Sequence, residues 1–446
     1  MTESGADLLI YGMAEKAIIK LLKRLADGEP FSRINDLQQT VFLASDKSQI
    51  PAVGEEKILE LPHHDELTND KVLFAKTFRI WEEEISRLNP ARIIQPNSTG
   101  WLVINPPAGI STEKELDEIY SPPFTRLPHP KYQKRGAIPA WEMIKHSITM
   151  HRGCFGGCSF CAISAHQGKF VSSRSQGSIL LEVEQIVAMP GFKGHITDLG
   201  GPSANMYRMT PINPDICRKC KRPSCIYPKI CSNLDTDHNP MIDLYRKVRT
   251  HPAIKKVTVG SGIRYDLFMN HKEDEARKRG HQKYFRELLL HHVSGRLKVA
   301  PEHTSDRVLK IMRKPSFKKF EQLKRDFDLI CRQNNLNQQL VPYFISSHPG
   351  SQSEDMAQLA EITRRMGFRL EQVQDFTPTP GTLATTMYYT GLDPYTLKPL
   401  PVARSRDEKD RQRNYFFWYK DAAQKKRPQA NSALKHRGAK RLKGRG

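Results

Sequence analysis

Apolar and polar positions along the chain follow two periods, one typical of buried strands and one typical of amphipathic helices. Residues 5–28 begin with a short apolar run, pass a glycine, and then place apolar side chains at helical spacing. The apolar stripe of this predicted helix consists of Ala17, Ile18, Leu21, Leu22 and Leu25. The run "TVFLAS" follows as another strand. Together they predict a remnant of a doubly wound α/β domain in residues 1–104, and we expect the beginning of that domain to be absent.

A second and longer α/β pattern follows a proline-rich connector at residues 105–140. Within residues 141–390, short apolar strands that end in small or polar residues alternate with helical periodicity. The six predicted strands cover residues 147–153, 195–201, 255–262, 296–303, 338–350 and 369–381. The helix between the first two has Ser175 or Ser178 as its N-cap. Because such alternation requires parallel pairing, it predicts a partial (β/α)6 TIM-type barrel, with the chemistry at the C-terminal strand ends.

Composition narrows the class of protein. The chain has 446 residues, of which 38% are hydrophobic and 26% charged, and no apolar run approaches the roughly 18 residues of a membrane span. The N-terminus lacks the pattern of a secretory signal. Seven of the eight cysteines fall between Cys154 and Cys231, which favours metal binding in a reducing compartment over disulfides. We therefore expect a cytoplasmic protein without membrane contact.

The net charge of +22 is concentrated at the C-terminal end. Residues 401–446 contain 15 Lys or Arg against 4 Asp or Glu, which is half of the excess. Within the C-terminal extension of residues 391–446, this composition predicts a basic, disordered tail. The same tail makes contact with RNA or ribosomes an open alternative.

The stretch "HRGCFGGCSFCAI" carries the most specific chemistry. It places Cys154, Cys158 and Cys161 within eight residues, whereas a structural zinc site uses four ligands. Three thiolates on a four-iron cluster leave one iron open to a small molecule. The neighbouring glycines permit a tight turn around such a cluster, and Phe160 would shield one side of it.

This cysteine spacing, in the loop after the first strand of a six-unit barrel, resembles the radical SAM superfamily. The resemblance implies a [4Fe-4S] cluster whose open iron binds S-adenosylmethionine (SAM), and reductive cleavage of SAM to methionine and a 5′-deoxyadenosyl radical. That radical would abstract a hydrogen from a substrate that the sequence does not identify. The electron would come from a reductant protein such as a flavodoxin or ferredoxin.

Later motifs resemble further parts of the superfamily. "LGGP" resembles the glycine pair that receives the methionyl amino group, which implies roles for Gly200 and Gly201, although Pro202 replaces an acidic residue often found there. "VAPEH" implies a ribose contact for Glu302. "GSGIRYD" places Arg264 where it would meet the SAM carboxylate or form an ordinary salt bridge. The order of all motifs resembles YgiQ-type radical SAM proteins, whose N-terminal domain is similar to cobalamin-binding domains.

A second cysteine group lies in a predicted insertion at residues 210–240. It consists of Cys217, Cys220, Cys225 and Cys231. Four thiols can close either a zinc site or an auxiliary iron–sulfur cluster, and the sequence leaves both open. The lone Cys331, on an apolar helix stripe, is interpreted as a packing residue, and His348 as a turn-capping one.

Two functions from different classes explain these features. The first is a radical SAM enzyme with an unknown substrate. The second is a non-catalytic, zinc-containing nucleic-acid-binding protein, which would explain the basic tail but not a group of only three cysteines.

Overall fold

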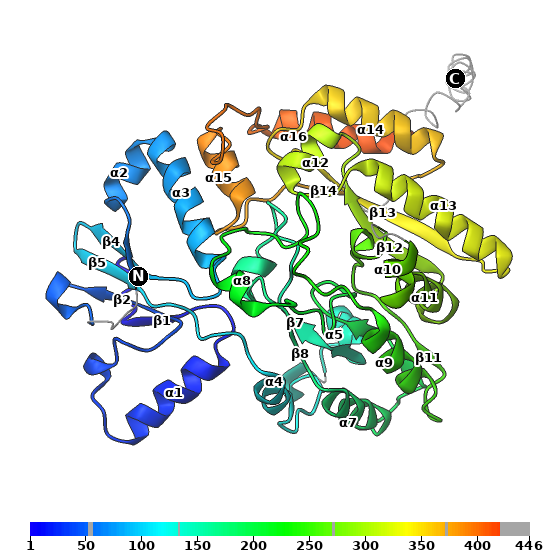
Figure 1. Ribbon diagram of the computed structural model, residues 1–446, viewed down its shortest axis with the longest axis horizontal. Helices are drawn as coiled ribbons and strands as arrows, with labels where there is room; N and C mark the ends of the chain where they lie inside the picture. Colours follow the sequence, from blue (N-terminus) through cyan, green and yellow to red (C-terminus); the bar gives the residue numbers. More distant parts are fainter. Residues whose placement is uncertain (52–56, 133, 270–272, 371–372, 420–446) are drawn as a thin grey trace, which may run out of the picture.

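The computed structural model describes residues 1–51, 57–132, 134–269, 273–370 and 373–419 (Figure 1). An N-terminal unit built on one sheet lies beside a larger region in which strands alternate with helices (Figure 1). The predicted α/β class is therefore confirmed.

The N-terminal sheet is mixed, with the strand order β1-β2-β5-β4-β3. Its strands are β1 (Leu8–Ile10), β2 (Thr40–Ala44), β3 (Ile58–Glu60), β4 (Arg92–Asn97) and β5 (Gly100–Ile104). Only β3 and β4 pair in parallel. A doubly wound domain has a mostly parallel sheet, so the predicted doubly wound remnant is wrong. The reason is the tight turn from Asn97 to Gly100, which joins β4 directly to β5 and so requires antiparallel pairing.

The helices of this unit are α1 (Glu15–Ala26), α2 (His64–Asn69) and α3 (Lys71–Ile85). The predicted helix is present as α1, but of its apolar stripe only Ala17 is buried, whereas Ile18 and Leu22 are 43% and 59% exposed. Helix α1 lies away from the sheet and is tied to the rest of the chain by ion pairs of Glu15 and Lys16 (Figure 1). Helix α4 (Glu113–Tyr120) lies in the connector, and α5 (Pro139–Ile144) begins at its end.

The strands of the second region lie within the predicted runs, except β8, which the sequence analysis did not predict. They are β6 (Ser147–Thr149), β7 (His151–Arg152), β8 (Ser172–Ser173), β9 (His195–Ile196), β10 (Asp198–Gly200), β11 (Lys256–Val257), β12 (Arg296–Glu302), β13 (Gln339–Ser346) and β14 (Val373–Asp375). Parallel ladders join β6 to β10, β9 to β11, β12 to β13 and β13 to β14, while β7 and β8 form a small antiparallel ribbon. Among the described residues no ladder joins β11 to β12 or β14 to β6, so the pairing does not form a closed barrel.

The helices of this region alternate with the strands along the chain, and most of them lie on the outer side of the strands (Figure 1). They are α6 (Ile163–His166), α7 (Gln176–Val187), α8 (Pro214–Arg218), α9 (Asn239–Arg249), α10 (Glu273–Lys278), α11 (His281–Glu287), α12 (Asp306–Met312), α13 (Phe317–Gln333), α14 (Ser353–Arg365), α15 (Leu383–Thr390) and α16 (Arg406–Asn414). Helix α7 begins as predicted, because the Ser175 hydroxyl accepts a hydrogen bond from the Ser178 amide. Cys331 of α13 is buried in the main core, which confirms its interpretation as a packing residue.

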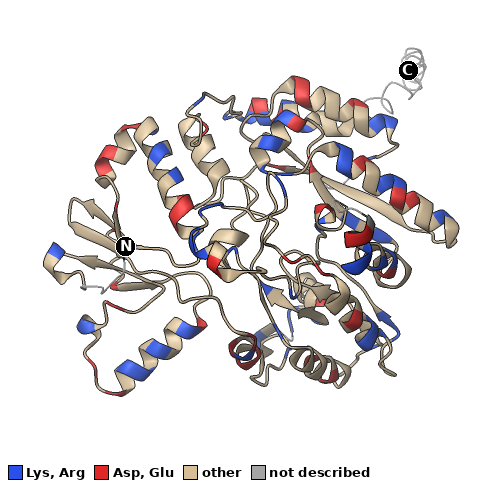
Figure 2. Ribbon diagram, viewed as in Figure 1, with Lys and Arg blue, Asp and Glu red and all other residues tan. Residues whose placement is uncertain are grey.

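The first part of the predicted tail is folded. Gln412 of α16 is buried, accepts a hydrogen bond from the Ser347 amide and donates one to the Ser351 carbonyl. Residues 420–446, which contain most of the tail's basic side chains, lie outside the described residues. Elsewhere Lys and Arg alternate with Asp and Glu along the helices (Figure 2). No helix in the described part is long and apolar enough to cross a membrane.

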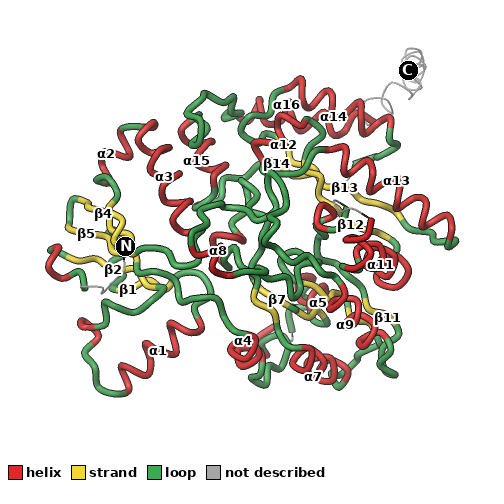
Figure 3. Tube along the Cα trace, viewed as in Figure 1, coloured by secondary structure: helices red, strands yellow, loops and turns green. Residues whose placement is uncertain are grey.

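Long loops fill the middle of the molecule, between the N-terminal sheet and the parallel strands (Figure 3). The two units are joined here by Glu82 of α3, whose carboxylate accepts two hydrogen bonds from Arg313 at 2.7 and 2.9 Å. The Tyr395 hydroxyl donates a third at 2.7 Å. Both cysteine groups belong to these central loops.

Candidate functional site

The first three cysteines lie in the loop between β7 and α6, directly after the first strand of the parallel series. Phe155 anchors this loop because its side chain is fully buried in a small apolar cluster against which Cys154 also packs. Gly157 has a φ of +56°, and a Cβ there would lie 2.5 Å from the Pro223 carbonyl oxygen. The glycine that the sequence placed at a tight turn is therefore required by close packing against a second loop.

Burial dominates the chemistry of these thiols. It raises the pKa of Cys154 to about 11 and that of Cys161 to about 12, with repulsion from Cys158 adding to both. At neutral pH such thiols stay protonated unless a cation replaces their protons. The donor set therefore fits a metal centre that brings its own positive charge.

Arg264 provides positive charge beside one of these cysteines. Its Nη1 donates to the Cys158 sulfur at 3.3 Å, while Nε and Nη2 donate to the two Asp266 oxygens at 2.9 and 2.7 Å. Asn205 fixes the backbone of Arg264 with hydrogen bonds at both its amide and its carbonyl. Of the two roles that the sequence left open, the structure displays the salt bridge, and it adds a contact with sulfur that the sequence did not predict.

Ser159 holds the middle of the cysteine loop from three directions. Its amide donates to the Met312 carbonyl at 3.0 Å, and its carbonyl accepts from the Ala384 amide at 2.7 Å. Its hydroxyl lies 3.2 Å from Nε2 of His348, whose Nδ1 lies 2.8 Å from the Pro349 carbonyl oxygen. Burial lowers the pKa of His348 to about 3, so the ring is neutral. His348 thus supports the loop and a turn, in keeping with its predicted turn-capping role.

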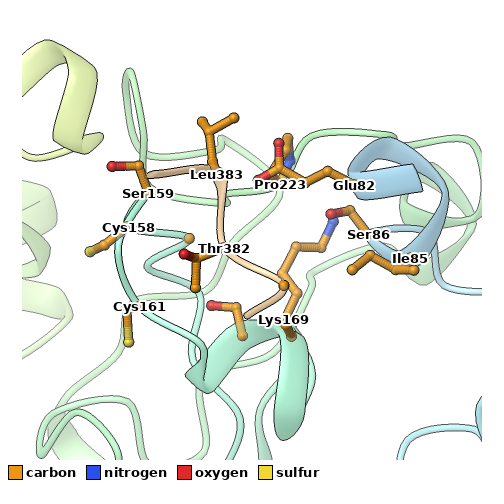
Figure 4. A pocket seen from close by; sticks show the side chains of 14 residues that line it. Glu82, Ile85, Ser86, Cys158, Ser159, Cys161, Lys169, Pro223, Thr382 and Leu383 are labelled. Carbon is orange, nitrogen blue, oxygen red and sulfur yellow. The ribbon is translucent and has the colours of Figure 1, made fainter. Parts of the chain in front are cut away.

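The pocket beside this loop is shown in Figure 4. Cys158, Ser159 and Cys161 contribute one wall, and Glu82 and Ser86 of the N-terminal unit contribute another. The Lys169 side chain extends across the pocket toward Ser86 (Figure 4). Its Nζ donates to the Arg222 carbonyl at 2.9 Å, which links the loop of the first cysteine group to that of the second.

Glu302 stands at the end of β12 in a backbone conformation that L-residues seldom adopt, with φ +70°. Its carboxylate is buried and lies 3.5 Å from Nζ of Lys314. Burial raises the pKa of Glu302, and Lys314 and Arg264 oppose the rise. The Glu302 charge also makes a small contribution to the raised pKa of Cys161. Strained backbone of this kind is typical of functional sites.

Several buried polar atoms near Glu302 have no hydrogen-bond partner in the part of the chain that the structure describes. His303 accepts hydrogen bonds at Nδ1 from the amides of Thr304 and Ser305, so its proton is on Nε2, which has no acceptor. The Thr304, Ser347 and Tyr265 hydroxyls are also unpaired. Unpaired buried donors are costly, and they are expected where a polar ligand binds.

Gly200 and Gly201 line a second pocket with Ile163, which lies two residues after Cys161. Close packing against neighbouring side chains explains why both positions are glycine. A Cβ on Gly201 would collide with the His151 ring, and one on Gly200 would lie 2.6 Å from the Ser261 hydroxyl. The pocket also contains Asp198, whose carboxylate accepts hydrogen bonds from the Gly260 and Ser261 amides. An acidic side chain is therefore present here, but four residues before Pro202.

The second cysteine group lies in a loop closed by the bridge between Pro211 and Leu234. Asn233 fixes the loop ends, since its amide donates to the Asn213 carbonyl at 2.8 Å and contacts the Cys217 sulfur at 3.5 Å. Across the described residues, no three or more His, Cys, Asp or Glu side chains lie at the spacing that holds a single metal ion. This holds for the sulfurs of both cysteine groups.

Comparison with known proteins identifies the family. The model of the Radical SAM N-terminal family matches residues 1–147, and that of a domain of unknown function, DUF3362, matches residues 371–446. A UPF0313 protein of Bacteroides thetaiotaomicron is 52% identical over 436 residues, which cover 95% of this chain and 70% of the relative. The chain belongs to the UPF0313 family. It is a radical SAM protein, as the motifs predict, and therefore an enzyme of that class.

Other similar proteins extend the comparison. A UPF0313 protein of Porphyromonas gingivalis is 49% identical over 419 residues, covering 94% of this chain and 66% of the relative. A solved structure of TsrM from Kitasatospora setae, with cobalamin and a [4Fe-4S] cluster bound, has a TM-score of 0.44 at 15% identity and covers 92% of this chain and 63% of that chain. OxsB with aqua-cobalamin bound has a TM-score of 0.44 at 11% identity, over 89% and 42% of the two chains. This UPF0313 chain spans between 61% and 70% of the length of the curated relatives that it matches.

Within this UPF0313 chain the predicted site residues fall into two groups. Cys154, Cys158 and Arg264 lie together, since Arg264 donates to the Cys158 sulfur and all three side chains lie beside Gly156. Cys161 and Glu302 are related to this group through charge interactions. Phe160 instead packs on the main core with its ring 6.0 Å from that of His348, and its predicted role as a shield stays a prediction. Sequence reasoning missed Ser159, because its contact with His348 joins distant segments. It also missed Lys314 and Asp266, although Asp266 lies only two residues after Arg264 in the motif "GSGIRYD".

Proposed function

We propose that Cys154, Cys158 and Cys161 bind a [4Fe-4S] cluster at which SAM is cleaved reductively to generate a 5′-deoxyadenosyl radical. The observation that carries this proposal is the hydrogen bond from Arg264 to the Cys158 sulfur, inside a loop that supplies only three thiols. A guanidinium on a cysteine sulfur favours the thiolate that a cluster requires. The fourth iron would remain open to SAM.

The protein's own part is to fix the loop and exclude water. Ser159 joins the loop to α12 and α15, while buried Phe155 holds its beginning. When bound, the cluster and SAM together supply the electron and the homolytic chemistry, while the chain supplies orientation and a dry environment.

The SAM site is proposed between the glycine pocket and the end of β12. Gly200 and Gly201 would present backbone groups to the methionyl moiety, with the carboxylate of Asp198 close to its ammonium. Glu302 would accept hydrogen bonds from the ribose hydroxyls, and the unpaired Nε2 proton of His303 would find an acceptor there. A polar nucleoside fits a site whose buried donors have no protein partner.

We further propose that the parallel strands of residues 141–390 form an open (β/α)6 barrel. Residues 1–104 would be a separate N-terminal domain, residues 105–140 its connector, and residues 391–446 a C-terminal extension. An external reductant such as a flavodoxin or ferredoxin would supply the electron. The alternative of a non-catalytic nucleic-acid-binding protein is not favoured, since the class is enzymatic and no described residue supports contact with RNA.

The proposal can be tested by electron paramagnetic resonance of the anaerobically reconstituted and reduced chain. We expect a cluster signal that changes shape when SAM is added, and loss of this SAM-responsive signal in Cys158→Ala. Cys331→Ala is the matched control, because its thiol packs in the core away from the site, and it should keep the signal. A SAM-responsive signal that survives in Cys158→Ala contradicts the assignment. Total iron is not the readout, since the second cysteine group can also contribute iron.

A further inference from the structure

The second cysteine group is packed directly against the first loop. The Cys225 amide donates to the Phe155 carbonyl at 3.1 Å, and the Ser224 hydroxyl donates to the same oxygen at 3.1 Å. The Pro223 carbonyl occupies the space beside Gly157. Phe155 and Gly157 both lie between Cys154 and Cys158, so the second loop contacts the first at its centre.

Both loops also share one apolar cluster. Its buried members are Phe155, Val171, Met206, Met209, Ile226 and Leu234, together with Leu267. Cys154 of the first group packs against this cluster, and so do Cys225 and Cys231 of the second. A change in the second loop therefore reaches the first through packed side chains as well as hydrogen bonds.

The four thiols of the second group are gathered in a small loop held by local hydrogen bonds. The Cys231 amide donates to the Cys225 carbonyl at 2.8 Å, and the Cys220 amide donates to the Cys217 carbonyl at 3.1 Å. The four sulfurs do not lie at the spacing of a single metal ion in this structure, but four cysteines on one short loop supply the number and the kind of ligands that a tetrathiolate centre uses.

We propose that Cys217, Cys220, Cys225 and Cys231 bind a second, structural metal centre whose loop braces the cluster-binding loop at Phe155 and Gly157. The ligand chemistry is that of a tetrathiolate zinc ion or of a closed iron–sulfur cluster, since four cysteines satisfy either. A closed ligand set leaves no position for a substrate, which separates this centre from the reaction. Cations close to the sulfurs offset the charge of four thiolates, and Lys169, which is buried, is one of them.

The test uses the full chain in a Cys154→Ala, Cys158→Ala, Cys161→Ala background, where the radical SAM cluster is absent. After anaerobic purification, we expect zinc or iron at one centre per chain, measured by elemental analysis. Zinc with no absorbance near about 400 nm identifies a zinc site, whereas iron with sulfide and that absorbance identifies an iron–sulfur cluster. Either result supports the proposal. Absence of bound metal in this background overturns it, and it does so without bearing on the first cluster.

Two further variants separate ligation from misfolding. Adding Cys217→Ser and Cys225→Ser to the background should abolish metal binding, whereas adding Cys331→Ser should leave it unchanged. Retention of the metal in the first variant overturns the ligand assignment. If the first variant does not fold, native mass spectrometry of the unmodified chain provides the test instead. A mass that includes a second metal centre supports the proposal. A mass that includes the [4Fe-4S] cluster alone overturns it.

The bracing is tested with the first group intact. Cys217→Ser should lose the SAM-responsive cluster signal faster than the unmodified chain during incubation with a chelator, because the contact at Phe155 is loosened. Equal rates of loss contradict the bracing.

Discussion

The guanidinium of Arg264 donates a hydrogen bond to the sulfur of Cys158, with 3.3 Å between Nη1 and Sγ. The two residues are more than a hundred positions apart; Arg264 is buried, and Cys158 is partly buried. Asp266 holds the other edge of the guanidinium through two hydrogen bonds, so the direction of Nη1 is fixed. Hydrogen bonds and net charge at cysteine sulfur tune the potential of an iron–sulfur cluster. Arg264 is therefore interpreted as a positioning residue that makes the cluster easier to reduce.

Arg264→Gln should shift the midpoint potential of the cluster to more negative values, because the reduced cluster loses a neighbouring positive charge. Arg264→Lys keeps the charge but cannot hold both Asp266 oxygens and the sulfur, so its shift should be smaller. Arg264→Gln leaves the buried Asp266 unpaired, and it should lower the free energy of unfolding by about 3–5 kcal/mol. A redox titration followed by electron paramagnetic resonance measures the shift. A potential that is equal in all three proteins contradicts the role of Arg264.

Ser159→Ala removes the hydroxyl contact with His348 but keeps the backbone hydrogen bonds to Met312 and Ala384. The expected loss of stability is about 0.5–1.5 kcal/mol, as for an ordinary buried hydrogen bond. Chemical denaturation measures this loss. A variant as stable as the unmodified chain would show that the contact with His348 does not hold the loop.

Substitutions of Glu302 separate its backbone strain from its carboxylate. Glu302→Gly relieves the cost of a φ of +70°, while Glu302→Gln keeps the side-chain volume and removes the charge. We expect both variants to weaken SAM binding by about tenfold or more, corresponding to about 1.4 kcal/mol for a lost charged hydrogen bond. Isothermal titration under anaerobic conditions provides the affinity. Unchanged affinity in both variants removes Glu302 from the SAM site.

Because of the lowered pKa of Glu287, we expect the folded chain to lose stability at acidic pH. Burial alone would raise this pKa, but the nearby His292 ring and the hydrogen bonds from Arg246 and Arg249 lower it to about 2. Since the pKa in the folded state lies below the ordinary value of 4.5, the stabilisation is complete above about pH 4.5 and is lost as the pH falls toward 2. Glu287→Gln should therefore be less stable than the unmodified chain at neutral pH, and the difference should shrink on acidification. A constant difference between pH 7 and pH 3 in thermal melts contradicts this.

The parallel strands and the three-cysteine loop could be predicted from the sequence because each depends on local spacing. Strands β6, β10, β12 and β13 lie inside the predicted runs, and the Ser175 cap follows from a local pattern. The direction of the N-terminal strands could not be predicted without recognising the turn "NSTG" between β4 and β5 as a hairpin. Helical periodicity predicts the apolar stripe of α1, but the fold does not bury most of that stripe in a core.

The support of the site depends on long-range contacts, which a single sequence does not display. Ser159 contacts His348, which lies 189 positions later in the chain. The Cys225 amide donates a hydrogen bond to the Phe155 carbonyl, and the spacing of the cysteines does not predict this contact between the two loops. The pocket beside Pro202 contains the acidic side chain of Asp198, which a motif comparison at fixed positions overlooks. The cysteines of the candidate site can therefore be recognised from local sequence spacing, whereas the contacts that position them depend on the three-dimensional fold.

The most direct test of the central claim is anaerobic formation of 5′-deoxyadenosine from SAM in the presence of a chemical reductant. We predict that the reconstituted chain forms 5′-deoxyadenosine together with methionine, that Cys331→Ala does so at a similar rate, and that Cys158→Ala falls to the background of reductant alone. Equal formation by the unmodified chain and by Cys158→Ala, or none by a chain shown to carry the SAM-responsive cluster, would contradict the account.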